Sequence, residues 1–141
     1  MEEKDKQLLI ADLCARLPYG VWVECCGISG KLDNIWLTHF YNGGNAVVDV
    51  NGNTDFFHDS DYFDITKIKP YLRPTSSMTD EEYNDLCMYC SWVWHDDSEN
   101  LTKIRGDYKC YDWLDAHYFD YRGLIEKGLA LEAPKDMYAI K

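Results

Sequence analysis

The stretch that decides the fold is Ile65-Thr-Lys-Ile-Lys-Pro-Tyr-Leu-Arg-Pro-Thr-Ser-Ser-Met-Thr-Asp-Glu-Glu82. Pro70 and Pro74 fix their own φ and push the residue before each of them toward an extended conformation. The segment between the prolines is therefore predicted to be extended, with Tyr71 and Leu72 on opposite sides. The stretch divides the chain into a β-rich first half and a second half that is helical or irregular.

A helix begins at the end of this stretch. Thr79 is a good N-cap residue, and Glu82 stands three positions later, as a capping box requires. Asp80 and Glu81 place negative charge in the first turn, which the helix dipole favours. We expect a helix over residues 80–94. Its apolar stripe is predicted to contain Tyr83, Leu86, Cys87, Cys90, Val93 and Trp94.

The first half of the sequence predicts one helix and a small antiparallel sheet. Leu9, Leu13 and Leu17 recur at four-residue spacing, which predicts a helix over residues 4–17 that ends at Pro18. Asn51-Gly52 between two apolar runs is a strong hairpin signal. The predicted strands cover residues 19–26, 34–41, 47–50 and 53–57, and residues 62–69 add a fifth strand or a single helical turn.

The second half predicts a further helix over residues 107–119, after a polar loop over residues 95–105. Gly123 and Gly128 interrupt the tail, which we expect to wrap on the domain in turns. The predicted fold is α+β in a single domain, residues 1–141. Its β-rich part covers about 19–69, as a four- to five-stranded sheet that can curl into an SH3-like barrel, and its helical part covers about 79–134.

Composition restricts the function. The chain has 25 acidic and 14 basic residues, a net charge of −11, and no basic stripe, so direct nucleic-acid binding is not expected. Twenty-one aromatic residues, 11 Tyr, 5 Trp and 5 Phe, favour partly exposed rings of the kind found at protein interfaces. The charge favours a protein partner with a basic or mixed surface.

The charged N-terminus, Met-Glu-Glu-Lys-Asp-Lys, has neither the pattern of a signal peptide nor a following apolar core. We therefore expect no membrane association and a cytoplasmic location in a host cell. Disulfides are rare in that compartment, so the six cysteines are predicted to be reduced.

Three segments resemble small uncharacterised proteins of gut-bacterial phages and mobile elements. They are residues 68–79 of the stretch quoted above, residues 112–134 (Asp-Trp-Leu-Asp-Ala-His-Tyr-Phe-Asp-Tyr-Arg-Gly-Leu-Ile-Glu-Lys-Gly-Leu-Ala-Leu-Glu-Ala-Pro), and residues 12–20. They cover about a third of the chain. The resemblance implies a source but no activity.

Cysteine chemistry is the main alternative to a binding function. Cys87-x-x-Cys90 could form a tetrahedral zinc site with His95 and Cys110. The spacing of the second pair is irregular, and buried reduced cysteines explain the pattern better, because free cysteine behaves as a small hydrophobe. We therefore expect neither metal nor cofactor.

A small cysteine-dependent hydrolase would need a nucleophile such as Cys25 or Cys26 beside His39 or His58. The sequence contains no Gly-x-Ser-x-Gly motif and no cysteine-hydrolase signature. A catalytic role is therefore disfavoured, and no catalytic residue is assigned.

The most acidic run interleaves carboxylates with aromatic rings over residues 55–64. It could imitate DNA, and so inhibit a host nucleic-acid enzyme, or bind a basic partner; a solvated loop is the simpler interpretation. Arg122 could hold a ligand carboxylate or form an internal ion pair. We expect a non-enzymatic accessory protein that binds another protein. Its candidate partner-binding residues are Asp55, Asp59, Asp61, Tyr62, Asp64, Tyr71, Arg73, Tyr121 and Arg122.

Overall fold

The computed structural model describes residues 2–25, 27–37, 46–50 and 63–138, and the predicted α+β class is confirmed. The chain divides into two compact units, Met1–Tyr71 and Leu72–Lys141. The boundary falls inside the Pro70–Pro74 stretch, where the sequence predicted a change from β-rich to helical structure. Each unit is described by itself.

Unit 1 begins with helix α1 (Glu3–Arg16), within one residue of the predicted bounds. Pro18 lies in the short 3-10 helix η1 (Leu17–Tyr19) that follows, and thus marks the end of α1. Leu9 and Leu13 are fully buried, as their spacing predicted. The leucine stripe therefore forms the core-facing side of this helix.

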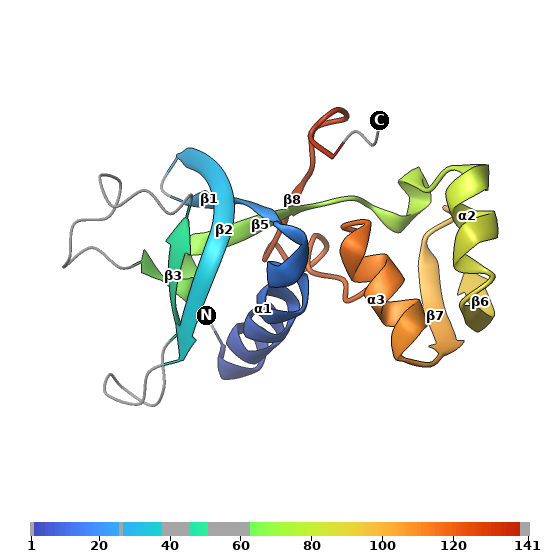
Figure 1. Ribbon diagram of the computed structural model, residues 1–141, viewed down its shortest axis with the longest axis horizontal. Coiled ribbons are helices and arrows are strands. Elements are labelled where there is room, and N and C mark those ends of the chain that lie inside the picture. Colours follow the sequence, from blue (N-terminus) through green and yellow to red (C-terminus); the bar gives the residue numbers. More distant parts are fainter. Residues whose placement is uncertain (1, 26, 38–45, 51–62, 139–141) are drawn as a thin grey trace. The chain divides into compact units, whose positions relative to one another are not determined.

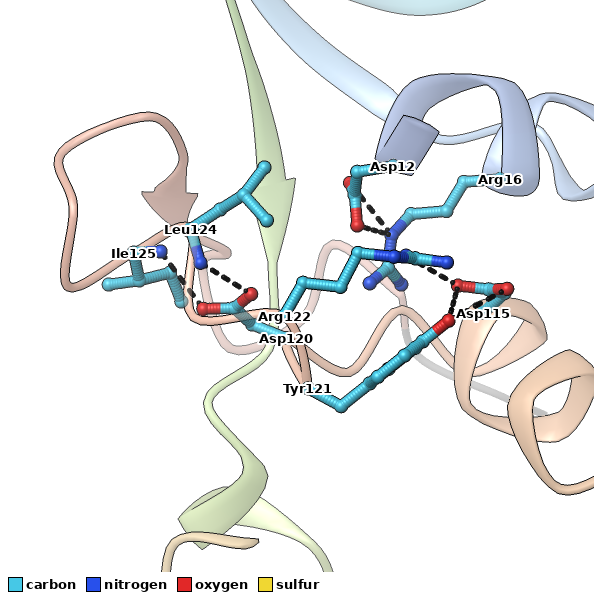
Figure 2. Close-up of polar contacts among 8 residues, drawn as sticks. All are labelled: Asp12, Arg16, Asp115, Asp120, Tyr121, Arg122, Leu124 and Ile125. Atoms are coloured by element: carbon cyan, nitrogen blue, oxygen red, sulfur yellow. Dashed lines mark hydrogen bonds and ion pairs between the residues drawn. The ribbon is translucent and has the colours of Figure 1, made fainter. Parts of the chain in front are cut away.

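The same helix also buries an ion pair one turn apart. The Nε of Arg16 donates to both carboxylate oxygens of Asp12 at 3.0 Å, and both side chains are fully buried. Figure 2 shows the two side chains meeting along the helix. A buried charge costs several kcal/mol unless it is paired, so these two residues depend on each other.

The sheet of unit 1 is antiparallel throughout. Its strands are ordered β4-β3-β2-β1-β5, with β2 the longest, as Figure 1 shows. Residues 62–69 were predicted to form a strand or a helical turn, and residues 63–69 contain both. The elements are β1 (Trp22–Cys25), β2 (Ile28–Leu37), β3 (Ala46–Val50), β4 (Phe63–Asp64), the 3-10 turn η2 (Ile65–Lys67) and β5 (Ile68–Leu72).

The predicted strand over residues 53–57 and the Asn51-Gly52 turn lie outside the described residues, as does the end of the predicted strand 34–41. Closure into an SH3-like barrel stays a prediction, because the segment that joins β3 to β4 is among them. Strand β5 does have the predicted alternation: Pro70 and Leu72 are buried, and Tyr71 between them is half-buried.

Unit 2 contains two helices and a hairpin. Its elements are the 3-10 turn η3 (Thr75–Ser77), α2 (Asp80–Leu86), β6 (Cys90–His95), β7 (Leu101–Gly106), α3 (Tyr108–Ala116) and the two-residue strand β8 (Leu131–Glu132). The predicted capping box is confirmed: the Glu82 N–H donates to Thr79 Oγ1 at 3.1 Å, and the Thr79 N–H donates to Glu82 Oε1 at 3.0 Å.

The helix predicted over residues 80–94 is wrong beyond Leu86. Residues 90–95 form strand β6, and residues 101–106 form its antiparallel partner β7, although a loop was predicted over residues 95–105. The physical reason is the alternation of Trp92, Val93 and Trp94, whose aromatic and β-branched side chains fit a pleated surface. The apolar spacing of this segment also fits a helix, and tertiary packing selects the strand.

A tight loop joins the two strands. One carboxylate oxygen of Asp96 accepts from the N–H groups of Ser98 and Asn100, both at 2.9 Å. Glu99 has a φ of 64°, a left-handed conformation that the loop requires. Thr75 then fixes the start of β7, because its Oγ1 accepts from the Leu101 N–H at 2.8 Å.

Helix α3 lies within the predicted 107–119, and Asp107 caps it by accepting from the Lys109 N–H at 3.0 Å. Its Cys110, Trp113 and Leu114 form a core cluster with Leu86 of α2 and with Phe119. The inner side of the hairpin, including Val93 and Ile104, packs against this cluster. One face of the hairpin therefore packs against the core.

Cys90 and Cys110 form a disulfide, so the prediction that every cysteine is reduced is wrong. The sequence places these residues twenty positions apart, and the hairpin brings the start of β6 to the first turn of α3. Gly106 pairs with Cys90, and a Cβ atom at Gly106 would lie only 2.8 Å from the Cβ of Cys110. The missing side chain of Gly106 makes room for the disulfide.

Candidate functional site

Arg73, a predicted partner-binding residue, is tied into unit 2. Its guanidinium donates to the two carboxylate oxygens of Glu82 at 2.7 and 2.8 Å and lies 4.1 Å from the centroid of the Phe119 ring. Its backbone N–H donates to the Tyr118 carbonyl at 2.8 Å, and its carbonyl accepts from the Asp120 N–H at 2.9 Å. These contacts give Arg73 a structural role.

The ion pair changes the acidity of its carboxyl group. Burial opposes ionisation of Glu82, but hydrogen bonds from Arg73 and Thr79 outweigh that effect, so the pKa of Glu82 lies below its ordinary value. Glu82 therefore serves the capping box and the Arg73 pair while charged.

Tyr121 and Arg122 are also held internally, as Figure 2 shows. The Arg122 guanidinium donates to Asp115 Oδ1 at 3.0 Å, and the Tyr121 hydroxyl donates to the same carboxylate at 3.1 Å. The Arg122 guanidinium also lies 4.4 Å from the centroid of the Tyr121 ring. Of the two roles considered for Arg122, the internal ion pair is the one observed.

The neighbouring Asp120 stabilises the start of the tail. Its two carboxylate oxygens accept from the backbone N–H groups of Leu124 and Ile125, each at 2.9 Å (Figure 2). Leu124 is fully buried and Leu129 is 7% exposed. The prediction that the tail is a packed part of the protein is therefore confirmed at these positions.

The candidate zinc ligands do not assemble. The disulfide occupies Cys90 and Cys110, while Cys87 is an exposed free thiol and His95 an exposed side chain. Over residues 2–25, 27–37, 46–50 and 63–138, no group of three or more His, Cys, Asp or Glu side chains could hold a metal ion. The Cys87 side chain instead hydrogen-bonds Tyr83 and raises the pKa of its phenol, and burial adds to this shift.

Other predicted residues lie outside the described parts or in unit 1. Asp55, Asp59, Asp61 and Tyr62 are outside them, and so are Cys26, His39 and His58 of the hydrolase alternative. Asp64 is in β4, where its backbone pairs with Val47. Cys25 is buried, and the Tyr71 hydroxyl lies 2.9 Å from Ser29 Oγ, within hydrogen-bonding distance.

The exposed side chains of unit 2 point to a different surface. Among the described residues, five of the six exposed large hydrophobic side chains fall between positions 88 and 108. They are Met88, Tyr89, Trp92, Trp94 and Tyr108. Trp92 is 60% exposed, although tryptophan is usually well buried. Apolar exposure concentrated in one segment is typical of an interaction surface.

Two of these residues, Trp92 and Trp94, form the outer face of the β6–β7 hairpin together with exposed Lys103 and Arg105. We call these four residues the hairpin face. Trp92 pairs with Arg105, and Trp94 pairs with Lys103, so each indole has a cation directly across the sheet. The indole centroids are 5.8 Å apart, and Lys103 Nζ lies 5.1 Å from the centroid of the Trp94 ring. All four side chains are exposed.

The two ends of the hairpin differ in chemistry. At the loop end, Asp97 and Glu99 are exposed. A pocket of about 370 Å³ lies at this end, lined by Thr75, Ser76, Met78, Asp80, Tyr83, His95 and Glu99. At the other end the chain runs into exposed Met88, Tyr89 and Tyr108. From the loop to the base of the hairpin, the exposed side chains are thus acidic, then cationic and aromatic, then apolar.

This surface was not predicted, because the expected helix over residues 80–94 places Trp94 on its apolar stripe. The sequence does contain an alternating pattern in each strand. Val93 lies between two tryptophans, and Ile104 lies between two basic residues, Lys103 and Arg105. Two such runs around an acidic turn are typical of a hairpin with one buried and one exposed face.

No helix in the described parts of the chain is long and apolar enough to cross a membrane. Comparison with protein-family models gives no match to this chain, and comparison with curated proteins and with solved structures gives none either.

Proposed function

We propose that this protein is a non-enzymatic binding protein that contacts a protein partner of mixed surface charge through the hairpin face. The observation that carries the proposal is the exposed pair Trp92 and Trp94, each with a cation across the sheet. Tryptophan and arginine are the side chains most enriched among residues that dominate binding energy. Burying a large apolar side chain contributes about 1.5–3 kcal/mol, and Trp92, which is 60% exposed, forgoes much of it in the free protein.

The surface suits a protein better than a nucleic acid. Exposed aromatic rings with cations can stack bases, but affinity for nucleic acid comes largely from several basic residues that displace counterions from phosphates. The hairpin face has two cations, on a chain with a net charge of −11. Acidic Asp97 and Glu99 at the loop end would repel a phosphate backbone.

We also propose that the protein is an accessory protein of a gut-bacterial phage or mobile element. The motifs at residues 68–79 and 112–134 support the source. In these motifs Arg73, Asp115 and Asp120 form the internal contacts of unit 2. The resemblance thus follows residues that specify the fold, and the hairpin face lies between the two motifs.

The test uses the full chain as bait in host lysate, beside a variant with Trp92→Ser and Trp94→Ser. Tyr19→Ser is the matched control, because Tyr19 is as exposed as Trp94, at 37%, but belongs to unit 1. Melting curves establish that each variant is folded. Any captured protein is then purified and its Kd is measured directly by calorimetry.

We expect one protein to bind wild type and the Tyr19→Ser control, and to lose at least about tenfold in affinity to the double tryptophan variant. Equal binding to all three proteins would move the contact away from the hairpin. Binding of a single-stranded oligonucleotide that depends on both tryptophans, with no protein captured, would replace the proposal by a nucleic-acid function. A dimer abolished by the double substitution would assign the face to self-association.

A further inference from the structure

We infer that the partner contributes an extended segment with two carboxylates at positions i and i+2, followed toward the hairpin tip by a basic residue. This inference rests on the proposed function, because it specifies what the hairpin face recognises. Its basis is the order of charges along the hairpin, which the strand register fixes.

The spacing of the two cations sets the spacing of the carboxylates. Lys103 and Arg105 are two positions apart on β7, so their side chains lie on the same face of the hairpin. This is also the face of Trp94 and Trp92, with which they pair on β6. Two residues of strand correspond to about 7 Å. In an extended partner segment, side chains at i and i+2 have the same spacing and also share a face. One carboxylate can therefore face each cation.

The two indole rings favour one conformation of the partner segment. A flat surface of two adjacent rings, with centroids 5.8 Å apart, favours an extended chain that lies along it over a bulky side chain that inserts into it. The Lys103 ammonium already lies over the Trp94 ring. Burial of that ring by a partner would desolvate the cation, which makes an opposing carboxylate more valuable.

The tip of the hairpin requires the opposite charge. Asp97 and Glu99 are exposed there. A basic side chain that follows the two carboxylates of the partner segment would meet these two acids and could form charge-assisted hydrogen bonds with them.

The order of charges therefore distinguishes this partner from a uniformly acidic or uniformly basic one. A uniformly acidic segment would be repelled at the tip, and a uniformly basic one would be repelled at Lys103 and Arg105. The preference for the proposed segment over a uniformly charged one is a difference between two affinities. Repulsion between like charges in the wrong complex contributes much of this difference.

Synthetic peptides provide the probe. The first is a twelve-residue peptide with Glu at i and i+2, aromatic or β-branched residues around them and Arg-Lys at one end. The second replaces each Glu by Gln. The third inverts every charge of the first, with Lys at i and i+2 and Glu-Glu at the end. Binding is measured at low salt by NMR titration of the full-length protein.

A charge-inverted protein is the matched variant. Asp97→Lys, Glu99→Lys, Lys103→Glu and Arg105→Glu together leave the net charge at −11, because two acids become bases and two bases become acids. Tryptophan fluorescence and a melting curve establish that the hairpin is retained. Lys103→Gln with Arg105→Gln is a milder second variant.

We expect wild type to prefer the first peptide over the other two by at least about tenfold, with weaker binding as salt screens the charges. The charge-inverted protein should instead prefer the third peptide. Wild type could instead bind all three peptides equally and lose this binding on Trp92→Ser and Trp94→Ser. That result would overturn the charge order but leave the hairpin face as the binding surface. Binding that is insensitive to the tryptophans would remove the proposed function as well.

Discussion

The guanidinium of Arg73 donates one hydrogen bond to each carboxylate oxygen of Glu82, at 2.7 and 2.8 Å. The pair joins the proline-bounded stretch to the first turn of α2. Both side chains are largely buried, with exposed fractions of 20% and 17%. Because Arg73 also covers the Phe119 ring, one side chain connects three segments of unit 2.

Arg73→Lys should lower the free energy of unfolding by about 1.5–3 kcal/mol. An ammonium lacks the planar fork that gives one aligned hydrogen bond to each oxygen of Glu82, and it cannot stack flat on Phe119. Urea unfolding of the full chain measures the difference. Arg105→Lys is the control, since that arginine is exposed on the hairpin and should change stability by less than about 0.5 kcal/mol. Equal effects of the two substitutions would contradict a structural role for the pair.

Glu82→Gln should destabilise the protein in a pH-dependent way. The folded-state pKa of Glu82 is below its ordinary value, so the carboxylate contributes stability above the ordinary pKa and loses it as pH falls through the folded-state pKa. The stability difference between wild type and Glu82→Gln should therefore be largest near neutral pH and shrink on acidification below about pH 4.5. Glu81→Gln, in the same turn but exposed, is the control. A difference that grows toward low pH would contradict the assignment.

Loss of the Cys90–Cys110 disulfide should cost about 3 kcal/mol, the value expected for closing a loop of roughly this length. Cys110→Ala and Cys90→Ala should each lower the melting temperature and abolish its response to dithiothreitol. Cys87→Ser should preserve that response, because Cys87 is a free thiol. Mass spectrometry of the unreduced protein gives a direct check, and a count of six free thiols would show that the bridge is absent in solution.

Gly106→Ala should be among the most damaging single-methyl additions in unit 2. The new Cβ would lie 2.8 Å from the Cys110 Cβ and 3.4 Å from the Cys90 Cα, so the end of β7 would have to move away from α3. Overpacking of this kind typically costs about 1–3 kcal/mol. The melting temperature measures it, and Ser91→Ala, at an exposed position of β6, is the control. A Gly106→Ala protein as stable as the control would show that the packing around the disulfide can relax.

Truncation after Phe119 should leave an insoluble or molten chain. It removes Leu124 and Leu129, each worth about 1.5–3 kcal/mol of burial, from a protein whose total stability is expected to be about 5–15 kcal/mol. It also removes two hydrogen-bond donors to the Asp115 carboxylate, the Tyr121 hydroxyl and the Arg122 guanidinium. Circular dichroism during heating tests this. A sharp transition near the full-length midpoint would show that the tail is dispensable.

The sequence by itself determined the elements whose signals are local. The leucine spacing of α1, the Thr79–Glu82 capping box and the alternation between Pro70 and Leu72 all depend on residues within four positions of each other. Such contacts form with little loss of chain entropy, and their residue preferences are strong. The α+β class and the start of α2 could therefore be predicted.

Only the tertiary structure decided the fate of residues 87–106. Cys90, Val93 and Trp94 fit a helical stripe and a strand equally well by spacing, and the strand forms because Val93 and Ile104 together pack on the cluster built by α2 and α3. That choice turned Trp92 and Trp94 outward and brought Cys90 to Cys110. Contacts between distant positions leave no fixed spacing in the sequence, so the disulfide could not be predicted from it. The hairpin face left an alternating pattern in the sequence, but that pattern alone did not decide between strand and helix.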